Sequence, residues 1–327
     1  MTTSETQEEV QHVDSSVLDA PLNPVKVDRS FLGKIWYVLR RYPVIPLIVL
    51  AILVIAAAVG PSIAPYERDI GPIGDRHLGM FKYSELAIED QDAPKYSAWP
   101  AGFHLFGSDH IGRDVFTRVL HGARISMQVV LVSLVLGMFI GVSLGMISGY
   151  YGGITDEVIT RFVDIWYAMP FLMVALIVVL IFGRGLTVLL FVLALVAWAG
   201  FVRVIRAQVL VLKEMDYVAA ARVNGASDFR ILFKHLLPGI LNTAIVVGTL
   251  NTSGLILSES VLSFVGAGIQ PPTPAWGVMT NEGRDYLSIA AHQVLVPSAA
   301  IFMVVISLNF LGDWLRDRLD PRLRQLE

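Results

Sequence analysis

Six stretches of the chain contain no acidic, lysine or arginine side chain and are long enough, or nearly so, to cross a bilayer. A helix needs about 20 mainly apolar residues to span a hydrocarbon core of about 30 Å. Since backbone polar groups find no water inside lipid, such stretches must be helical. The sequence therefore predicts an all-α, polytopic membrane protein with six transmembrane helices, over residues 42–66, 125–155, 165–183, 185–202, 235–258 and 286–312.

The composition supports a membrane protein and excludes several other classes. Hydrophobic residues make up 54% of the chain and charged residues only 16%, against about 25% in soluble domains. A net charge of −3 gives no reason to expect a nucleic-acid partner. The absence of cysteine rules out disulfides and thiolate metal sites. The sequence also lacks a G-x-x-x-x-G-K-[ST] phosphate loop, a G-x-S-x-G elbow and an H-E-x-x-H pair, so we expect neither an ATP site nor an enzyme.

The same pattern suggests how the chain is divided. We expect a polar, disordered N-terminal tail, a first transmembrane helix, a long loop, a core of five helices and a charged C-terminal tail. The expected boundaries are 1–40, 41–66, 67–125, 126–312 and 313–327, with a charged loop over 213–238 inside the core.

Near the end of the long loop, residues 104–124 suggest an amphipathic helix lying on the membrane surface. Phe116, Val119 and Leu120 fall on one helical face, whereas Arg113, Asp114 and Arg118 lie mostly off it. Further along, 156–164 reads as a short polar loop containing a local Arg161–Asp164 ion pair. Only Arg184 separates the third stretch from the fourth, which predicts a tight hairpin there.

Lysine and arginine indicate the orientation of the chain. With six spans, the two termini and the 213–238 loop share one side with 16 of the 25 basic residues. Because basic residues favour the cytoplasmic side, we expect both termini and this loop to be cytoplasmic.

The local sequence of 217–238 predicts a helix, a sharp turn and a second short helix. Residues 219–224 are mostly good helix formers, and Gly225 is the residue type that most easily adopts the left-handed conformation after a helix. Ser227 suits an N-cap, with Asp228 at the positive end of the next helix. Pro238 suits the first turn of the helix that follows.

This segment resembles the cytoplasmic coupling loop of permease subunits of ATP-driven importers. That loop has a Glu-Ala-Ala, three residues, Gly pattern and, in the peptide branch, ends in His-x-Leu-Pro. Ala219 stands at the position of the family's Glu, which is a departure from the pattern. The matching residues are Ala220, Ala221, Gly225, His235, Leu237 and Pro238.

Four further segments follow the order and spacing of the same family, so the resemblance covers most of the chain from Phe106 onward. The chain is identified as a member of the dipeptide, oligopeptide and nickel branch of ABC transporter permeases, similar to the second of its two permease subunits. The four segments are 106–126, 161–170, 257–277 and 311–324.

The resemblance implies a type I ABC importer permease fold in a bacterial inner membrane. It also implies a heterodimer with a second permease, two cytoplasmic ATPases that bind ATP and magnesium, and an extracytoplasmic solute-binding protein. The cargo would be a di- or oligopeptide, with nickel chelates or another small solute as the alternative. The residues expected to couple to the ATPase are Ala220, Ala221, Arg222, Gly225, Ala226, Ser227, Asp228, His235 and Pro238.

Two further features stand within the predicted helices. Gly137, Gly141, Gly145 and Gly149 recur every four residues, so we expect them to let another helix approach closely. Glu259 is a carboxylate near the outer part of the fifth stretch, where it is costly. It either lines the translocation path or forms a buried hydrogen bond to another helix.

Two other classes of protein fit the sequence less well. A secondary transporter would need coupling-ion residues within the bundle, and only Glu259 is a plain candidate. A membrane scaffold would not need a charged helix–turn–helix. We expect no metal at His235, because no second ligand stands at suitable spacing.

Overall fold

The computed structural model describes residues 43–84, 100 and 102–319. The predicted N-terminal tail, most of the 85–103 part of the long loop and the last eight residues lie outside the described residues. The helices are α2 (Val44–Ile63), α3 (Val115–Tyr151), α4 (Gly153–Ala168), α5 (Phe171–Phe182), α6 (Leu186–Leu212), α7 (Asp216–Val223), α8 (Asp228–Arg230), α9 (Leu237–Phe264), α10 (Trp276–Gly283) and α11 (His292–Leu319).

Shorter elements complete the described fold. Strands β1 (Lys82–Tyr83) and β2 (Phe103–His104) pair antiparallel, with Lys82 opposite His104. Two 3-10 turns, η2 (Ile73–Asp75) and η4 (Arg284–Tyr286), lie near them in the loops, and η3 (Ile231–Leu236) is a π-helical turn.

Five helical runs of the described structure are long and apolar enough to cross a membrane. They are α2, α3, α6, α11 and the continuous run from Asp228 to Phe264. A sixth is reached if α4 and α5, which meet at a bend of 91°, count as one broken span. Six predicted spans therefore correspond to five continuous helical runs and one bent pair.

The second span is longer than the sequence predicts. α3 runs unbroken for 37 residues, so the expected separate surface helix before residue 125 is wrong. Asp114 is the N-cap of this helix, and its carboxylate accepts a 2.7 Å hydrogen bond from the Thr117 N–H. Arg118 is buried rather than facing solvent, because acidic partners from other segments surround its guanidinium.

The predicted polar loop at 156–164 is part of helix α4. Gly152 and Gly153 have φ values of +65° and +53°, which reverse the chain after α3 and let a new helix start. The expected Arg161–Asp164 pair is also wrong. Asp164 pairs with Arg203 of α6 at 2.8 Å, and Arg161 lies 3.8 Å from Glu157.

The third span is broken at Pro170. α5 has only 12 residues, and the sharp bend coincides with the proline, which cannot continue the hydrogen bonding of α4. The predicted hairpin between the third and fourth spans is confirmed. Gly183 and Gly185, with φ values of +86° and +154°, flank Arg184 in the turn from α5 to α6.

The fifth span begins far earlier than the sequence predicts. No break separates the second short helix from α9, because α8, η3 and α9 form one run from Asp228 to Phe264. Pro238 sits in the first turn of α9, where its missing N–H is tolerated. Glu259 does not interrupt this helix, which continues for five more residues.

The last two elements also differ from the prediction. The connection after α9 contains the eight-residue helix α10, which the sequence analysis did not predict. Helix α11 starts at His292 and continues to Leu319, so it includes the first residues of the expected C-terminal tail.

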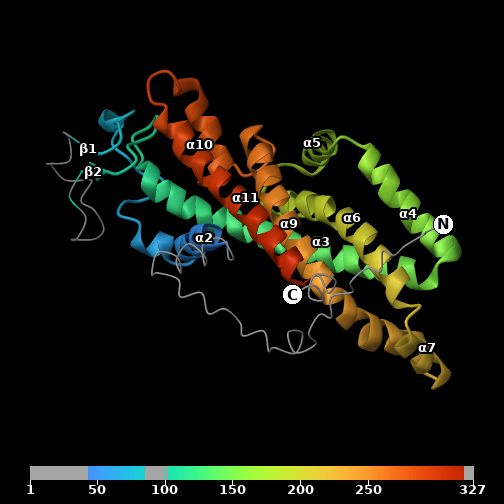
Figure 1. The fold of residues 1–327 in the computed structure, drawn as a ribbon. Helices are drawn as coiled ribbons and strands as arrows, with labels where there is room; N and C mark the ends of the chain where they lie inside the picture. The colour runs from blue at the N-terminus through green and yellow to red at the C-terminus, as the bar shows by residue number, and fades with distance from the viewer. Residues whose placement is uncertain (1–42, 85–99, 101, 320–327) are drawn as a thin grey trace, which may run out of the picture. The chain divides into compact units, whose positions relative to one another are not determined.

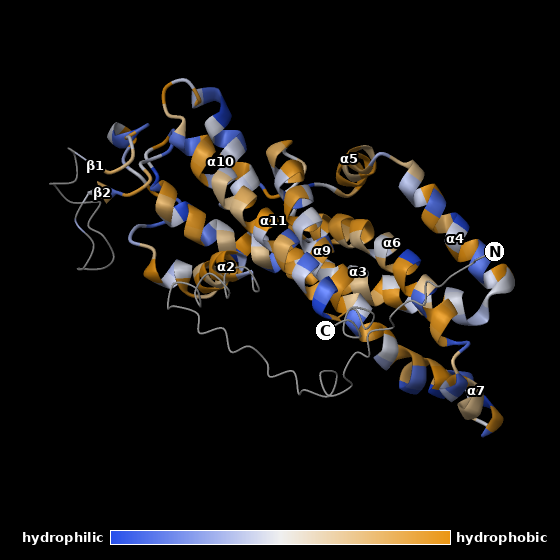
Figure 2. Ribbon diagram, viewed as in Figure 1, coloured by the Kyte–Doolittle hydropathy of each residue, from blue (hydrophilic) through white to orange (hydrophobic). Residues whose placement is uncertain are grey.

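The core of the bundle is built on α3 and α6, which make its most extensive helix pairing. Side chains such as Val129 of α3, Phe201 of α6 and Leu255 of α9 meet in one apolar cluster. By contrast, large apolar side chains on α2, α5 and α11 remain exposed. Figure 2 shows these apolar surfaces along the helices, with polar residues gathered towards the ends. That distribution suits a bundle surrounded by lipid.

The two ends of the bundle carry different structures (Figure 1). β1, β2 and α10 lie at one end, which we call the α10 end, and α7 lies at the other, which we call the α7 end. α6 starts towards the α10 end and finishes next to α7. At 1.5 Å per residue its 27 residues span about 40 Å.

Candidate functional site

The chain turn after α7 has the conformation expected at Gly225, whose φ is +76°. The Ala226 N–H donates to the Ala221 carbonyl, and the Gly225 N–H donates to the Arg222 carbonyl, both at 3.0 Å. These two bonds form the Schellman arrangement that ends a helix at a left-handed residue. The backbone therefore reverses immediately after α7 and leads into the run that starts at Asp228.

Polar contacts tie this turn to the end of α3. The Ser227 hydroxyl accepts a hydrogen bond of 3.4 Å from the Arg230 N–H, as expected of an N-cap. The neighbouring Asp228 carboxylate accepts one of 2.6 Å from the Tyr150 hydroxyl. The Arg222 guanidinium lies 6.0 Å from the centre of the Tyr150 ring. Because Tyr150 belongs to the last turn of α3, these contacts connect the turn to that helix.

Apolar contacts hold the underside of the turn against α6. The side chains of Val218, Ile231 and Leu236 are fully buried. They pack in one cluster with Ile205 and Val209 near the end of α6. The turn is therefore a packed structure and not a loose connection between two spans.

The opposite side of the turn exposes apolar side chains that the sequence analysis missed. Val223 is 89% exposed, Phe229 70% and Phe233 53%. The two phenylalanine rings lie 4.4 Å apart. The pair could have been recognised from the sequence, because two aromatic residues stand four positions apart on a charged helix. We call Val223, Phe229 and Phe233 the exposed apolar set.

The residues predicted to couple to an ATPase all lie along this turn. Ala221, Ala226 and His235 are half-buried. The ring of His235 lies 6.5 Å from that of Tyr217. The exposed members are Ala220, Arg222, Gly225, Ser227, Asp228 and Pro238.

The four-residue column of glycines in α3 faces α6. A methyl group placed on Gly137 would lie 2.5 Å from the Ala197 Cβ, and one on Gly149 would lie 2.9 Å from the Val209 Cβ. Equivalent additions at Gly141 and Gly145 also meet α6 backbone closer than van der Waals contact. The close approach of α3 and α6 thus requires residues without side chains at these positions.

Glu259 joins α9 to α3 inside the bundle. Its side chain is fully buried. One carboxylate oxygen accepts a 3.2 Å hydrogen bond from Ser126 of α3, and the other accepts a 2.9 Å bond from Ser263 of α9. Of the two roles that the sequence left open, this geometry favours the buried interhelical hydrogen bond, because the carboxylate reaches no open space within this chain.

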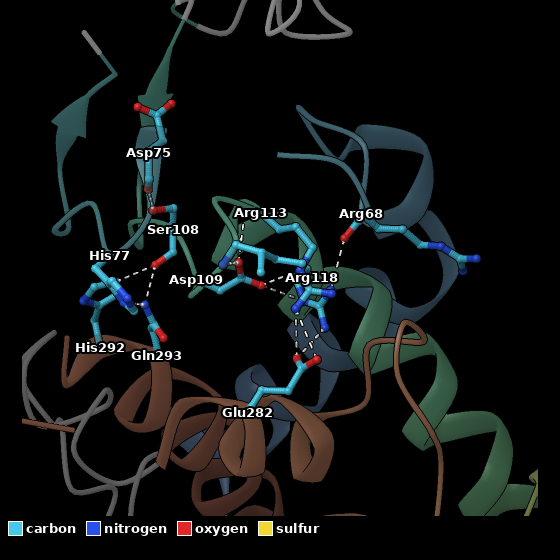
Figure 3. Close-up of polar contacts among 11 residues, drawn as sticks. Arg68, Asp75, His77, Ser108, Asp109, Arg113, Arg118, Glu282, His292 and Gln293 are labelled. Atoms are coloured by element: carbon cyan, nitrogen blue, oxygen red, sulfur yellow. Dashed lines mark hydrogen bonds and ion pairs between the residues drawn. The ribbon is translucent and has the colours of Figure 1, made fainter. Parts of the chain in front are cut away.

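An ion cluster at the α10 end joins residues 109–118 to Glu282 of α10, far away in the sequence (Figure 3). Arg113 donates to Asp109 at 2.6 Å and lies 3.1 Å from Glu282 of α10, and Arg118 donates to Glu282 at 2.9 Å. Both arginines are almost fully buried. Since buried charges require partners, the cluster fixes α10 against the start of α3. We call Asp109, Arg113, Arg118 and Glu282 the α10 ion cluster.

Beside it, a group of hydrogen bonds fixes the start of α11. His292 and Gln293 each contact the Ser108 carbonyl at 3.0 Å, and Gln293 also contacts His77 at 2.9 Å (Figure 3). Burial, and next the nearby His110, lower the pKa of His77, so its neutral form is favoured. Among the described residues, no group of three or more potential ligands is arranged to hold a metal ion.

Comparison with known proteins identifies the family. Residues 141–325 match the model described as the inner membrane component of binding-protein-dependent transport systems. The chain is 41% identical over 233 residues to the glutathione transport system permease protein GsiD of Pectobacterium atrosepticum, covering 71% of this chain and 77% of that protein. It is 36% identical over 281 residues to the dipeptide transport system permease protein DppC of Bacillus subtilis, covering 85% and 81%.

The chain belongs to this family of binding-protein-dependent transport permeases. The permease has the type I ABC importer fold, since its structure resembles the MetNI methionine ABC transporter in an inward-facing conformation. That match has a TM-score of 0.50 and 20% sequence identity, and it covers 62% of this chain and 96% of the other. Family membership excludes the secondary transporter and the scaffold that the sequence left open.

The permease is a multi-pass membrane protein and a transport subunit of an importer that works with ATPase and solute-binding partners. The family match begins at Gly141 and includes the whole turn after α7. It also includes Glu282, which the sequence analysis did not single out. The α10 ion cluster was missed because nothing local shows that Arg113 and Arg118 are buried.

Proposed function

We propose that this permease forms, with a second and different permease, the translocation path for di- or oligopeptides. The relatives named above are permeases for dipeptides and for glutathione, itself a small peptide. This favours peptides over the nickel chelates that the sequence left as an alternative. An extracytoplasmic solute-binding protein delivers the cargo, and two cytoplasmic ATPases supply the energy.

We place the turn after α7 on the cytoplasmic side, in a groove of one ATPase. The distribution of lysine and arginine supports that orientation for the turn and for both termini. The exposed apolar set supports docking, because aromatic side chains that insert into a partner's pocket dominate many interfaces. Arg222 and Asp228 lie beside them on the same turn and can pair with charges at the rim.

The single observation that carries the mechanism is the unbroken helical run from Asp228 to Phe264. Its 37 residues extend about 55 Å, so the element that meets the ATPase and the fifth span are one body. Closure of the ATPases on ATP would displace the turn, and the run would carry this motion towards the α10 end. There Glu259 links the run to α3, so the two helices move together.

The proposed function is tested by copurification and uptake. The permease is expressed with the ATPase, permease and binding-protein products of neighbouring genes, and the assembly is placed in vesicles. We expect ATP-dependent uptake of di- or oligopeptides that requires the binding protein. Stable assembly without peptide uptake would contradict the cargo but not the family. In the same assay, Phe229→Ala should reduce copurification of the ATPase, whereas Phe139→Ala, at a 72% exposed position on α3, should not affect that contact.

A further inference from the structure

A cavity of about 730 Å³ opens towards the α10 end of the bundle. It lies between α3, the turn that starts α6 and the connection that follows α9. Its wall is mainly apolar, with Val129 from α3, Leu190 from α6 and Ile269 from the connection. This volume falls within the range of roughly 300–1,000 Å³ that is typical of small-molecule sites.

Arg184 is the one charged residue that lines this cavity. It is also the only charged residue between positions 165 and 202. Gly183 and Gly185 hold it at the tip of the α5–α6 turn, and its side chain is exposed. Within the described part of the chain it makes no ion pair and no hydrogen bond. A guanidinium without a partner, beside an apolar hollow, is suited to bind a carboxylate through two parallel hydrogen bonds.

The opposite wall of the cavity is held in place by hydrogen bonds. The Ile269 N–H donates at 3.2 Å to the Ser263 hydroxyl, which itself donates at 2.9 Å to the buried Glu259. The Gln270 side-chain N–H group donates to the carbonyls of Gly266 and Gly268 at 3.1 Å. Its side-chain carbonyl accepts no bond from the described residues. That oxygen can therefore accept from an N–H group of a ligand.

We propose that this cavity binds a cargo peptide by its free C-terminal carboxylate, which pairs with Arg184. An apolar side chain of the peptide occupies the hollow beside Val129 and Leu190. The side-chain carbonyls of Gln128 and Gln270, which also line the cavity, accept from peptide N–H groups. This inference rests on the proposed function and assigns cargo contacts to Arg184, Gln128 and Gln270. A peptide without a free carboxylate, such as a C-terminal amide, loses the contact with Arg184.

The absence of cysteine in the chain provides a direct test. Val132, which lines the cavity and is 45% exposed, is changed to Cys, and the full transporter is assembled in nanodiscs with cysteine-free partners. The rate of labelling by a maleimide is then measured with dileucine or with its C-terminal amide. We expect dileucine to slow labelling and the amide to protect roughly tenfold less well, because a charge-assisted hydrogen bond is lost.

Three variants make the test specific. Arg184→Gln should abolish the difference between dileucine and its amide, and Arg184→Lys should restore part of it. Neither peptide should protect Leu180→Cys, which lies at an 85% exposed position of α5 away from the cavity lining. Equal protection by the two peptides, or unchanged protection after Arg184→Gln, would overturn the proposal.

Other ligands of Arg184 give different results. Protection that follows the content of anionic lipid instead of peptide would overturn the proposal and assign Arg184 to a lipid headgroup. Loss of the second permease from the Arg184→Gln assembly would overturn it and assign Arg184 to the subunit interface. Uptake of dileucine by the unmodified transporter tests the proposed function separately. Uptake of dileucine without any Arg184-dependent protection from labelling would overturn the proposed site but not the proposed function.

Discussion

Arg118 and Glu282 are 164 positions apart in the sequence, yet their side chains meet at 2.9 Å in the interior of the α10 end. The Arg118 side chain is only 1% exposed, and Glu282 also lies 3.1 Å from Arg113. Glu282 and Asp109 together thus neutralise the two buried guanidinium groups of Arg113 and Arg118. The position of α10 depends on this shared partner.

Glu282→Ala should therefore destabilise the protein strongly. It leaves two buried arginines short of an acidic partner, which costs about 3–5 kcal/mol when a buried pair is broken. The measurement is thermal unfolding of the purified permease in detergent. Asp285→Ala is the matched control, because the Asp285 side chain is 73% exposed and, among the described residues, forms an ion pair only with the exposed Arg284. Equal melting temperatures for the two variants would contradict the role of the cluster.

Gly225→Val should separate ATP hydrolysis from transport. A φ of +76° is unfavourable for a β-branched residue, although an added Cβ would meet no atom within 4 Å. The cost is therefore one of backbone conformation. We expect normal insertion, with poor ATPase docking or hydrolysis that moves no cargo. Gly225→Asn is the control, because asparagine tolerates the left-handed region better. Normal uptake by the valine variant would show that this turn only connects two spans and does not couple ATP hydrolysis to transport.

Gly141→Leu should impair folding and assembly of the bundle. The new side chain would collide with α6 at Trp198 and Phe201, and so push the two main core helices apart. Gly254→Leu is the control, because Gly254 of α9 has open space around it. Assembly with the second permease is measured by copurification. An assembled and active Gly141→Leu transporter would show that α3 and α6 need not approach so closely.

Glu259→Leu should insert normally but reduce both stability and transport. It removes the acceptor of the hydroxyl groups of Ser126 and Ser263, and so breaks the link between α3 and α9. Glu259→Gln keeps an acceptor oxygen and should retain most activity. Melting temperature and uptake are measured together for both variants. Full stability of Glu259→Leu, combined with a changed choice of cargo, would favour a role in the translocation path instead.

The histidine contacts near α11 should weaken in mild acid. The folded pKa of His77 lies below its unfolded value of about 6.5, so its neutral form contributes stability above that pH. The contribution is lost as the pH falls from 6.5 through the lower folded pKa. The groups that act on His77 are His110, Arg76, Asp109 and His292, and the Tyr286 ring lies 4.6 Å from it.

Hydrogen exchange of residues 104–114 at pH 7.5 and 5.5 measures this effect. Because base-catalysed exchange is itself slower at pH 5.5, protection factors are compared instead of raw rates. We expect lower protection factors at pH 5.5 than at pH 7.5 in the unmodified protein, and a smaller difference in His77→Asn. Asparagine is chosen because His77 has a φ of +59°, which asparagine tolerates. The same pH difference in both proteins would assign the effect to another titrating group.

The sequence alone determined the features that depend on local composition. The uncharged stretches predicted a helical membrane protein, because lipid offers backbone groups no other partner. Gly225 and Ser227 predicted the turn, since its conformation follows from those residues and their own hydrogen bonds. The family resemblance rested on such short motifs, and the comparisons confirm it. The glycine column showed that a helix would approach α3 closely, but not that the helix is α6.

Only the tertiary structure decided where charged side chains lie. Charge suggested a loop at 156–164, but Asp164 pairs with Arg203 and the segment is helical. Charge also suggested a solvent face for Arg113 and Arg118, but both are buried against Glu282. The cost of burying a charge depends on partners that the fold brings from distant segments. Local sequence records the charge but not its partner, so the burial of these charges and the cavity at Arg184 emerge only in three dimensions.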